Sequence, residues 1–275
     1  MKLIDFDALF DEKLAVYMEE HQDKYTEQEW EDVIPKLYKK FGDTYVAKVK
    51  CTPKEYYAKM SMEELSATLS AHLEQDVPVP EFLCAEIENR GDVSVLMPLL
   101  ESGDDQKAAY AVNLIGGNRE VFPVYVRLLR EGTLDSDVLD DVVDVLKHSA
   151  DEVKEDAIKM YEEKAGTEYA LEILSKTEPN DDKVYEILLK EFLCFGERTP
   201  MRASYLASYG DVRALPHLLA RIDKEEIGFV EFQELKYAIE ALGGEYTKPR
   251  DFTADKDYLA VEASCPIPSR KENLS

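Results

Sequence analysis

The sequence has few cationic residues for its 275-residue length. It carries 33 Lys and Arg against 58 Asp and Glu, a formal net charge of −25, and no run of Lys or Arg exceeds two. Proteins that bind nucleic acids place cations against phosphates, so this balance argues against DNA, RNA or an anionic membrane as a partner. An acidic surface keeps a protein soluble, and it can also attract a basic partner.

Long apolar runs and closely spaced cysteines are also missing. No stretch approaches the roughly 18 apolar residues of a membrane-spanning helix, and the acidic start MKLIDFDALFDEK lacks the apolar core of a secretion signal. The four cysteines, Cys51, Cys84, Cys194 and Cys265, are far apart and have apolar neighbours, as in EFLCAEI and EFLCFGE. We therefore predict a cytoplasmic protein whose cysteines are buried and reduced.

Motifs for catalysis are absent from the sequence as well. The histidines, His21, His72, His148 and His217, show none of the spacings of metal-binding motifs. The chain contains no GxSxG, no P-loop and no GxGxxG. The sequence therefore predicts no catalytic residue, no metal ligand and no cofactor.

Helical periodicity, in contrast, extends through almost the whole chain. TEQEWEDVIPKLYKKFGD begins with Thr26 and has Glu29 three residues later, which is a capping box, and apolar residues follow at steps of three and four. The same start signal recurs at Thr52 and at Ser61. No alternating run of Val, Ile or Thr bounded by hairpin turns competes with this pattern. We predict an all-α fold.

Two ten-residue segments are similar, with six identical positions, GDVSVLMPLL at 91–100 and GDVRALPHLL at 210–219. Each is followed by an acidic turn and by a helix that ends in a pair of glycines. A glycine with positive φ ends a helix, and the Asp or Asn after it can cap the next one. Prolines inside the apolar helices predict a bend there, because proline kinks a helix. These are Pro98, Pro123 and Pro216.

The pattern GD-x₂-A-L-P-x-L-L, followed by an acidic turn and a helix ending A-L-G-G, resembles the HEAT repeat, especially the short type of the phycobilisome-lyase relatives. The resemblance is clear over residues 91–131 and 199–244 and weaker over 132–198. It implies an α-solenoid of antiparallel helix pairs stacked side by side. The expected organisation is an N-terminal helical region at 1–77, packed on or continuous with the solenoid, HEAT-like repeats at 78–244, and a partly ordered tail at 245–275.

The same resemblance implies that partners bind to the concave face formed by the second helices. Aromatic and arginine side chains are common anchors of binding surfaces. The candidate residues on this face are Tyr110, Asn113, Arg202, Tyr205 and Tyr237. The predicted function is a non-catalytic scaffold or adaptor for another protein or peptide, and the acidic charge leaves a basic partner open.

Two alternatives remain at this stage. HEAT-like folds include an alkylpurine DNA glycosylase class and bilin lyases, so an enzyme with a pocket on the concave face is possible, although the net charge argues against a glycosylase. A deep pocket with a carboxylate beside aromatic and arginine side chains would favour an enzyme. In addition, DKEEIGFVEFQE at 223–234 resembles the end of a calcium-binding loop, but Ile227 stands where such a loop needs an oxygen ligand.

Overall fold

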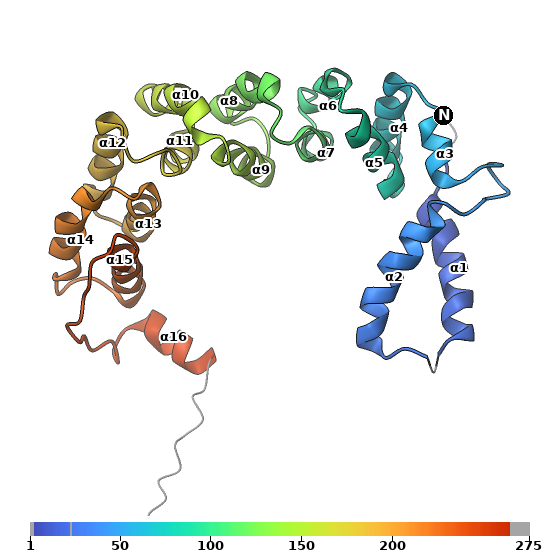
Figure 1. Ribbon diagram of the computed structural model, residues 1–275. Coiled ribbons are helices and arrows are strands. Elements are labelled where there is room, and N and C mark those ends of the chain that lie inside the picture. Colours follow the sequence, from blue (N-terminus) through green and yellow to red (C-terminus); the bar gives the residue numbers. More distant parts are fainter. Residues whose placement is uncertain (1–2, 23, 265–275) are drawn as a thin grey trace, which may run out of the picture. The chain divides into compact units, whose positions relative to one another are not determined.

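The computed structural model describes residues 3–22 and 24–264 (Figure 1). Within these residues the chain forms sixteen α-helices and three short 3₁₀ helices, and an isolated bridge between Val46 and Cys51 is the nearest approach to a strand. The prediction of an all-α fold is confirmed. No helix in the described part is long and apolar enough to cross a membrane.

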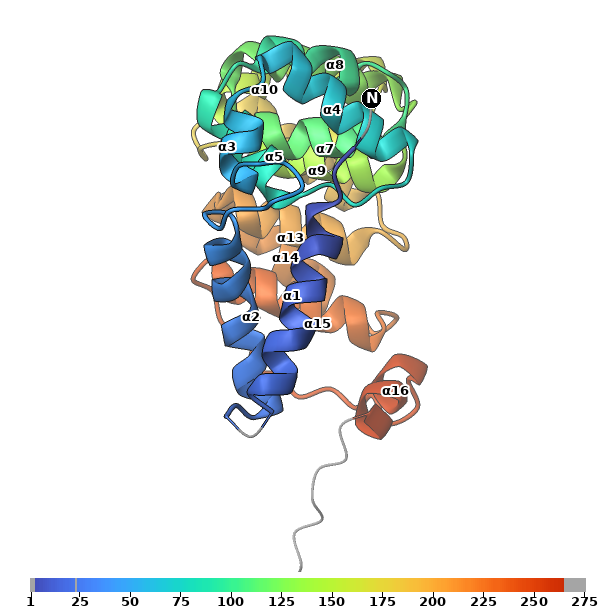
Figure 2. The same ribbon diagram turned by 90° about the vertical axis from the view of Figure 1, so that its right-hand side faces the viewer.

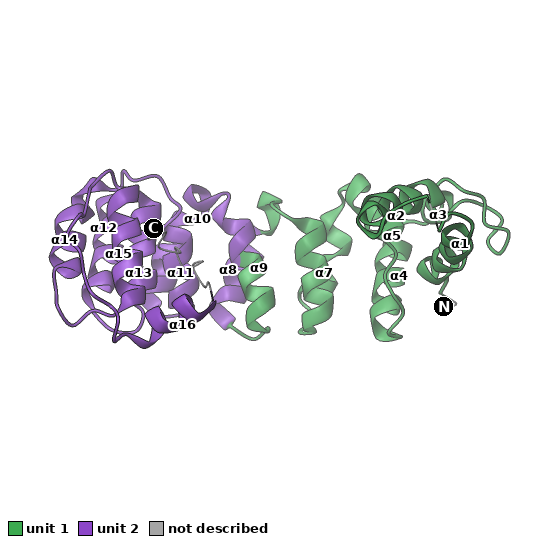
Figure 3. Cartoon of the chain, turned by 90° about the horizontal axis from the view of Figure 1, so that it is seen from below, with its two compact units in different colours: residues 1–121, 132–142 green, residues 122–131, 143–275 purple. Residues whose placement is uncertain are grey.

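The helices fall into two compact units, shown in different colours in Figure 3. Unit 1 comprises residues 1–121 and 132–142, and unit 2 comprises residues 122–131 and 143–275. Helix α9, Ser136–Lys147, contributes residues to both units. Residue 78 lies inside unit 1, and the domain limits inferred from the sequence stay a prediction.

Unit 1 begins with two long helices that lie side by side (Figure 2). Aromatic rings hold this pair against the rest of the unit, since Phe10 packs on Tyr38 and Phe41, and Tyr38 stacks on Phe82. Phe6 adds edge-on contacts with Tyr56 and Tyr57. The helices of unit 1 besides α9 are α1 Phe6–Glu20, α2 Glu27–Phe41, α3 Pro53–Ala58, α4 Met62–Glu74, α5 Glu81–Arg90, α6 Met97–Leu100 and α7 Asp105–Ile115.

Unit 2 arranges most of its helices in two rows (Figure 1). One row contains α8, α10, α12 and α14, and the second contains α11, α13 and α15, with α13 packed against both α12 and α15. Apolar side chains between the rows are buried, among them Leu171, Leu188, Leu206, Leu218 and Leu235. The helices are α8 Phe122–Glu131, α10 Ala150–Glu163, α11 Thr167–Leu174, α12 Asp182–Leu193, α13 Thr199–Tyr209, α14 Leu215–Ile222, α15 Phe229–Ala241 and α16 Lys256–Ser264.

The helix starts predicted from capping boxes are confirmed. Thr26, Thr52 and Ser61 each cap a helix, and in each case the glutamate three residues later bonds back to the backbone of the cap. At Thr26, for example, the backbone N–H donates to the Glu29 carboxylate at 2.8 Å. Because both partners lie within one turn, the signal acts locally.

The prolines of the repeats begin helices instead of bending them, so the prediction of mid-helix bends is wrong. Pro98, Pro123 and Pro216 are each the second residue of an α-helix. Proline is tolerated in the first helical turn because the N–H that it lacks would have no intrahelical partner there. Each of these helices follows a 3₁₀ turn, at Val93–Val95, Arg119–Val121 and Val212–Ala214.

The glycine-aspartate signal works as the sequence predicts. Gly91 and Gly210 end their helices with φ of 67° and 82°, a conformation that only glycine adopts readily. The carboxylates of Asp92 and Asp211 then accept backbone N–H groups two residues ahead, at 3.1 and 2.9 Å. Stopping one helix and starting another therefore takes two residues.

In both units, side-chain contacts join residues about thirty positions apart. The pairs, with their separations in the chain, include Lys107–Glu74 (33), Asp135–Asp105 (30), Tyr161–Glu191 (30) and Arg213–Asp182 (31). A separation of about thirty residues therefore recurs among the side-chain contacts of both units.

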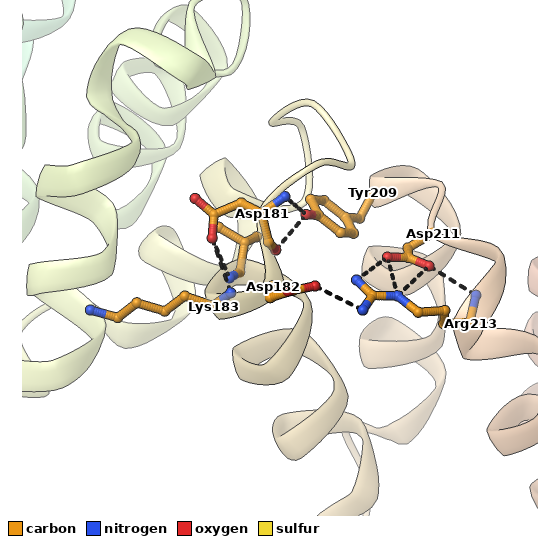
Figure 4. A network of polar contacts seen from close by, with 7 residues as sticks. Asp181, Asp182, Lys183, Tyr209, Asp211 and Arg213 are labelled. Atoms are coloured by element: carbon orange, nitrogen blue, oxygen red, sulfur yellow. Dashed lines mark hydrogen bonds and ion pairs between the residues drawn. The ribbon is translucent and has the colours of Figure 1, made fainter.

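One such connection ties the start of α12 to the turn after α13 (Figure 4). The Tyr209 hydroxyl accepts the backbone N–H of Asp181 at 3.1 Å and donates to the Asp181 carbonyl at 2.9 Å. The Arg213 guanidinium donates hydrogen bonds to the Asp211 carboxylate, and its Nη1 donates to Oδ1 of Asp182 at 2.8 Å. The tyrosine and the arginine thus connect the start of α12 to the end of α13 and the turn that follows it.

The segment after α15 packs on that helix through aromatic rings, as the sequence predicts. Phe252 and Tyr258 contact Phe229, and Tyr246 contacts Phe232. The stretch from Pro266, predicted to be loose, lies outside the described residues. Tyr246 is buried in unit 2, whereas Phe252 and Tyr258 are half-buried and α16 has no buried residue.

The cysteines of the described part are free thiols, and they differ in burial. Cys51 is buried, Cys84 is half-buried and Cys194 is exposed, and Cys265 lies outside the described residues. The prediction of burial is therefore wrong for Cys194. This residue follows the last residue of α12, where the chain turns outward and residues 193–198 are all exposed.

Candidate binding surfaces

The five residues predicted for a concave face fall into two groups. Tyr110 and Asn113 lie on α7 in unit 1, where Tyr110 is half-buried and Asn113 is exposed. Arg202 and Tyr205 lie on α13 and Tyr237 on α15, all in unit 2. The structure brings Arg202 and Tyr205 together, with the guanidinium carbon 5.9 Å from the ring centre.

Arg202 and Tyr205 are largely covered by their own neighbours. Arg202 is 6% exposed and Tyr205 is 9% exposed. Nη2 of Arg202 lies 2.7 Å from Oε1 of Glu168 on α11 and 4.0 Å from Oε2 of Glu191 on α12. Burial raises the pKa of Tyr205 to about 12. Arg202 joins α13 to α11 and α12, and both side chains offer little surface to a partner.

Tyr237, in contrast, stands at a groove between α13 and α15 with a volume of about 280 Å³. Its side chain is 77% exposed. Glu234, one turn earlier on the same face of α15, is also exposed. Neither side chain has a hydrogen-bond or ion-pair partner among the described residues. The other lining residues are Ser204, Ala207 and Ser208 on α13 and Ala238 and Ala241 on α15.

Helical spacing explains why this groove is open. On each helix the small residues stand three or four positions apart, at 204, 207 and 208 and at 238 and 241, so they share one face. Large apolar residues on the neighbouring faces, such as Leu206 and Leu235, are fully buried and hold the two helices together. The small serine and alanine side chains leave the groove open next to this contact, and Tyr237 lines one side of the groove.

The segment 223–234, which resembles a calcium-binding loop, forms contacts within unit 2 in the structure. Asp223 ends α14, and its carboxylate accepts the Tyr246 hydroxyl at 2.9 Å and Lys248 Nζ at 2.7 Å. The Lys248 ammonium, followed by that hydroxyl, lowers the pKa of Asp223. Ile227 is buried, and Glu234 belongs to the α13/α15 groove. Within residues 3–22 and 24–264, no three His, Cys, Asp or Glu side chains come together as a metal site.

Unit 1 contains a larger cleft that sequence reasoning missed. Its volume is about 780 Å³, and it is lined by α1, α2, the start of α3, the segment before α5 and α5 itself. Tyr38 donates its hydroxyl to Oδ1 of Asp7 at 2.5 Å. The Tyr38 ring stacks on Phe82 at 4.8 Å and meets Phe10 edge-on at 5.0 Å. The lining residues are Asp7, Phe10, Ile34, Pro35, Tyr38, Lys39, Lys54, Val79, Glu81, Phe82 and Ala85.

The Asp7 carboxylate is costly to ionise in this cleft. Burial raises the pKa of Asp7, the hydrogen bond from Tyr38 opposes that shift, and the charges of Asp5 and Asp11 raise the pKa further. Electrostatic coupling extends to other helices, since His72 acts to lower the pKa of Asp7. The cleft therefore contains a carboxylate that forms no ion pair with any of the described residues.

The charge of Asp7 also affects the pKa values of tyrosines on neighbouring helices. Burial raises the pKa of Tyr57 on α3 and of Tyr110 on α7, and the charge of Asp7 adds to both shifts. Tyr57 keeps a buried hydroxyl without a partner among the described residues. Tyr110, predicted from a helical repeat pattern, is thus within electrostatic reach of the unit 1 cleft.

His72 on α4 completes the surroundings of Asp7. Its Nδ1 lies 2.8 Å from the Pro78 carbonyl oxygen. Because a carbonyl only accepts, Nδ1 carries the proton of this bond, and Nε2 is buried without a partner among the described residues. No spacing in the sequence links these groups. The one local signal is the position of Asp7 between Phe6 and Phe10, at the apolar face of α1.

Comparisons of the chain with protein-family models, with curated proteins and with solved structures found no match. The two sites are therefore interpreted from their geometry. Each has a carboxylate beside an aromatic ring, Asp7 with Tyr38 and Glu234 with Tyr237. Such a combination suits a cation.

Proposed function

We propose that the protein is a non-catalytic scaffold or adaptor that binds a basic peptide segment in the groove between α13 and α15. The observation that carries this proposal is the pair of exposed, unpartnered side chains at the groove, Tyr237 and Glu234. A tyrosine with 77% of its side chain exposed contributes little to the fold. Tyrosine is, however, among the residues that dominate binding energy at interfaces.

The groove has the chemistry to receive a lysine or arginine side chain. The Glu234 carboxylate supplies the opposite charge, and the Tyr237 ring one turn away supplies a π face for the same cation. Ser204, Ala207 and Ser208 leave room for the peptide main chain, and the serine hydroxyls can bond to it. The net charge of −25 favours the approach of cationic segments over long range.

The arrangement within unit 2 supports a HEAT-like interpretation of the chain. Contacts recur at separations of about thirty residues, and the helices of unit 2 alternate between two rows. A stacked solenoid of helix pairs produces both features. In this interpretation α13 and α15 are second helices, the ones that form the binding face of such proteins. A cytoplasmic location fits the same proposal.

The experiment is a selection of random seven-residue peptides displayed on phage against the immobilised full-length chain. Lysine and arginine are expected to be enriched in the selected peptides. One selected peptide is then labelled and titrated by fluorescence anisotropy. Tyr237→Ala is expected to weaken its binding about tenfold, the effect of removing an interface residue worth about 1.4 kcal/mol. Glu234→Gln is expected to weaken it several-fold and to reduce its salt dependence.

Matched variants separate the groove from the rest of the surface. Tyr45→Ala removes another tyrosine that is 62% exposed, but in unit 1. Glu186→Gln removes an exposed carboxylate on α12, in the other row of helices. Both variants are expected to bind like the unchanged protein. The proposal is wrong if selected peptides lack cations, or if Tyr237→Ala and Tyr45→Ala bind equally well.

A further inference from the structure

The carboxylate of Asp7 has no cationic partner among the described residues, although it lies in a cleft with charged neighbours. Its one hydrogen bond there comes from the Tyr38 hydroxyl. Of the two lysines that line the cleft, Lys54 pairs with Asp43 at 2.7 Å. Lys39 then stands alone against Asp7 and Glu81. The charges of Asp5 and Asp11 also act on Asp7. The cleft is therefore negative overall.

The walls of this cleft are hydrocarbon and aromatic. Phe10, Tyr38 and Phe82 present a stacked pair and an edge-on ring, and Ile34, Pro35 and Val79 add aliphatic surface. A volume of about 780 Å³ falls within the roughly 300–1,000 Å³ of small-molecule sites. An inorganic cation would leave these apolar walls without a partner, whereas a ligand with a hydrocarbon body would cover them.

We propose that the unit 1 cleft binds a small organic ammonium ion, with its charged group at Asp7 and its hydrocarbon body against Phe10, Tyr38 and Phe82. The ammonium group donates hydrogen bonds to the carboxylate and supplies the charge that Asp7 lacks. The aromatic faces stabilise the same cation through their negative quadrupole. This site is independent of the peptide groove, because all of its residues belong to unit 1.

Binding of an ammonium ion needs the ionised form of Asp7. Since burial raises the pKa of Asp7, affinity is expected to fall as the pH is lowered through that raised pKa. The other ionisable groups that act on Asp7 or respond to it are Tyr38, Tyr57, His72, Tyr110, Asp5 and Asp11. All of these stay in place in Asp7→Asn, so this variant isolates the contribution of Asp7.

The test compares three probes by isothermal titration calorimetry with the full-length chain. 2-Phenylethylammonium has both the charge and the hydrocarbon body, 2-phenylethanol has the body alone, and methylammonium has the charge alone. The first is expected to bind at least about tenfold more tightly than either of the others, a difference of about 1.4 kcal/mol. Asp7→Asn is expected to abolish this preference. Glu12→Gln removes an exposed carboxylate on the same helix that is not among the charges acting on Asp7, and it is expected to keep the preference.

Each contrary result overturns the proposal in a distinct way. If 2-phenylethanol binds as tightly as 2-phenylethylammonium, the cleft recognises only the hydrocarbon body. If methylammonium binds as tightly, the cation is attracted by the net negative charge of the chain and not by the cleft. Tighter binding of Nα-acetyl-lysine methylamide would assign the cleft to a protein side chain. Tyr38→Phe provides a second variant that keeps the ring, and it is expected to weaken 2-phenylethylammonium several-fold because Asp7 loses its hydrogen bond. An unchanged affinity in both variants would exclude Asp7 from the site.

Discussion

Replacement of Gly166 by alanine provides a stringent test of the packing in unit 2. Gly166 precedes α11 and has a φ of +72°. A Cβ atom at this position would lie 2.6 Å from the Leu129 carbonyl oxygen of α8 and 3.0 Å from Met160 Cε of α10. The methionine end can rotate away, but the carbonyl belongs to a helix backbone. Gly166→Ala therefore forces α8 or α11 to move.

The expected cost has two parts, and a second glycine separates them. Gly210 has a similar φ of +82°, but a Cβ there would meet nothing within 4 Å. Gly210→Ala is expected to lower the free energy of unfolding by about 1–2 kcal/mol, the strain of a left-handed alanine. Gly166→Ala adds the overlap with Leu129, which costs about 1–3 kcal/mol in a packed interior. We expect its total loss to be about 2–5 kcal/mol.

Urea denaturation followed by far-ultraviolet circular dichroism measures these losses. Tryptophan fluorescence is unsuitable, because the single tryptophan, Trp30, lies on α2 in unit 1. Hydrogen exchange of peptides from α8, α10 and α11 is expected to rise in Gly166→Ala, since local opening becomes easier. Equal losses for Gly166→Ala and Gly210→Ala would refute the close approach of α11 to α8.

The remaining predictions concern ion pairs in unit 2. Arg202 and Arg198 both bind Glu168, but their side chains are 7% and 64% exposed. Arg202→Met is expected to lower the free energy of unfolding by about 2–3 kcal/mol. Arg198→Met is expected to lower it by at most about 0.5 kcal/mol. Equal losses of the two variants in urea denaturation would contradict the burial of Arg202. Arg213 lowers the pKa of Asp211, so ionised Asp211 stabilises the fold above its ordinary pKa of about 4, and this contribution is lost as the pH falls through the lowered value. The stability difference between the unchanged protein and Asp211→Asn, measured by denaturation at pH 6 and pH 3, is expected to shrink at pH 3.

Helix starts could be predicted from the sequence where all the partners lie within one turn. Thr26 and Ser61 show this, because cap and glutamate are three residues apart and form their bonds inside the helix. The effect of Pro98 was mispredicted because periodicity shows where apolar residues recur but not at which of them the helix begins. Exposure of Cys194 was missed because apolar neighbours in sequence do not determine which way the chain turns after α12.

The candidate sites depended much more on tertiary contacts. Tyr237 was predicted as a binding residue from the local repeat pattern, and the structure shows that its side chain is exposed, while its role in binding stays a prediction. Arg202 was predicted as a residue of a binding face, but its side chain is buried against Glu168 and Glu191, which two other helices supply. For the Asp7 cleft, the position of Asp7 between Phe6 and Phe10 was the one local signal, and it did not suffice to predict a site, since α1, α2 and α5 approach one another only after folding.

By itself, the sequence determined that the chain is helical, where several helices begin, and which glycines end them. These properties arise from hydrogen bonds and backbone angles within a few residues. The tertiary structure decided which side chains are exposed, which carboxylate lies uncompensated in an aromatic cleft, and which small residues open a groove. Burial and charge at a given residue depend on neighbours that are distant in the chain, and their positions follow from the packing of whole helices.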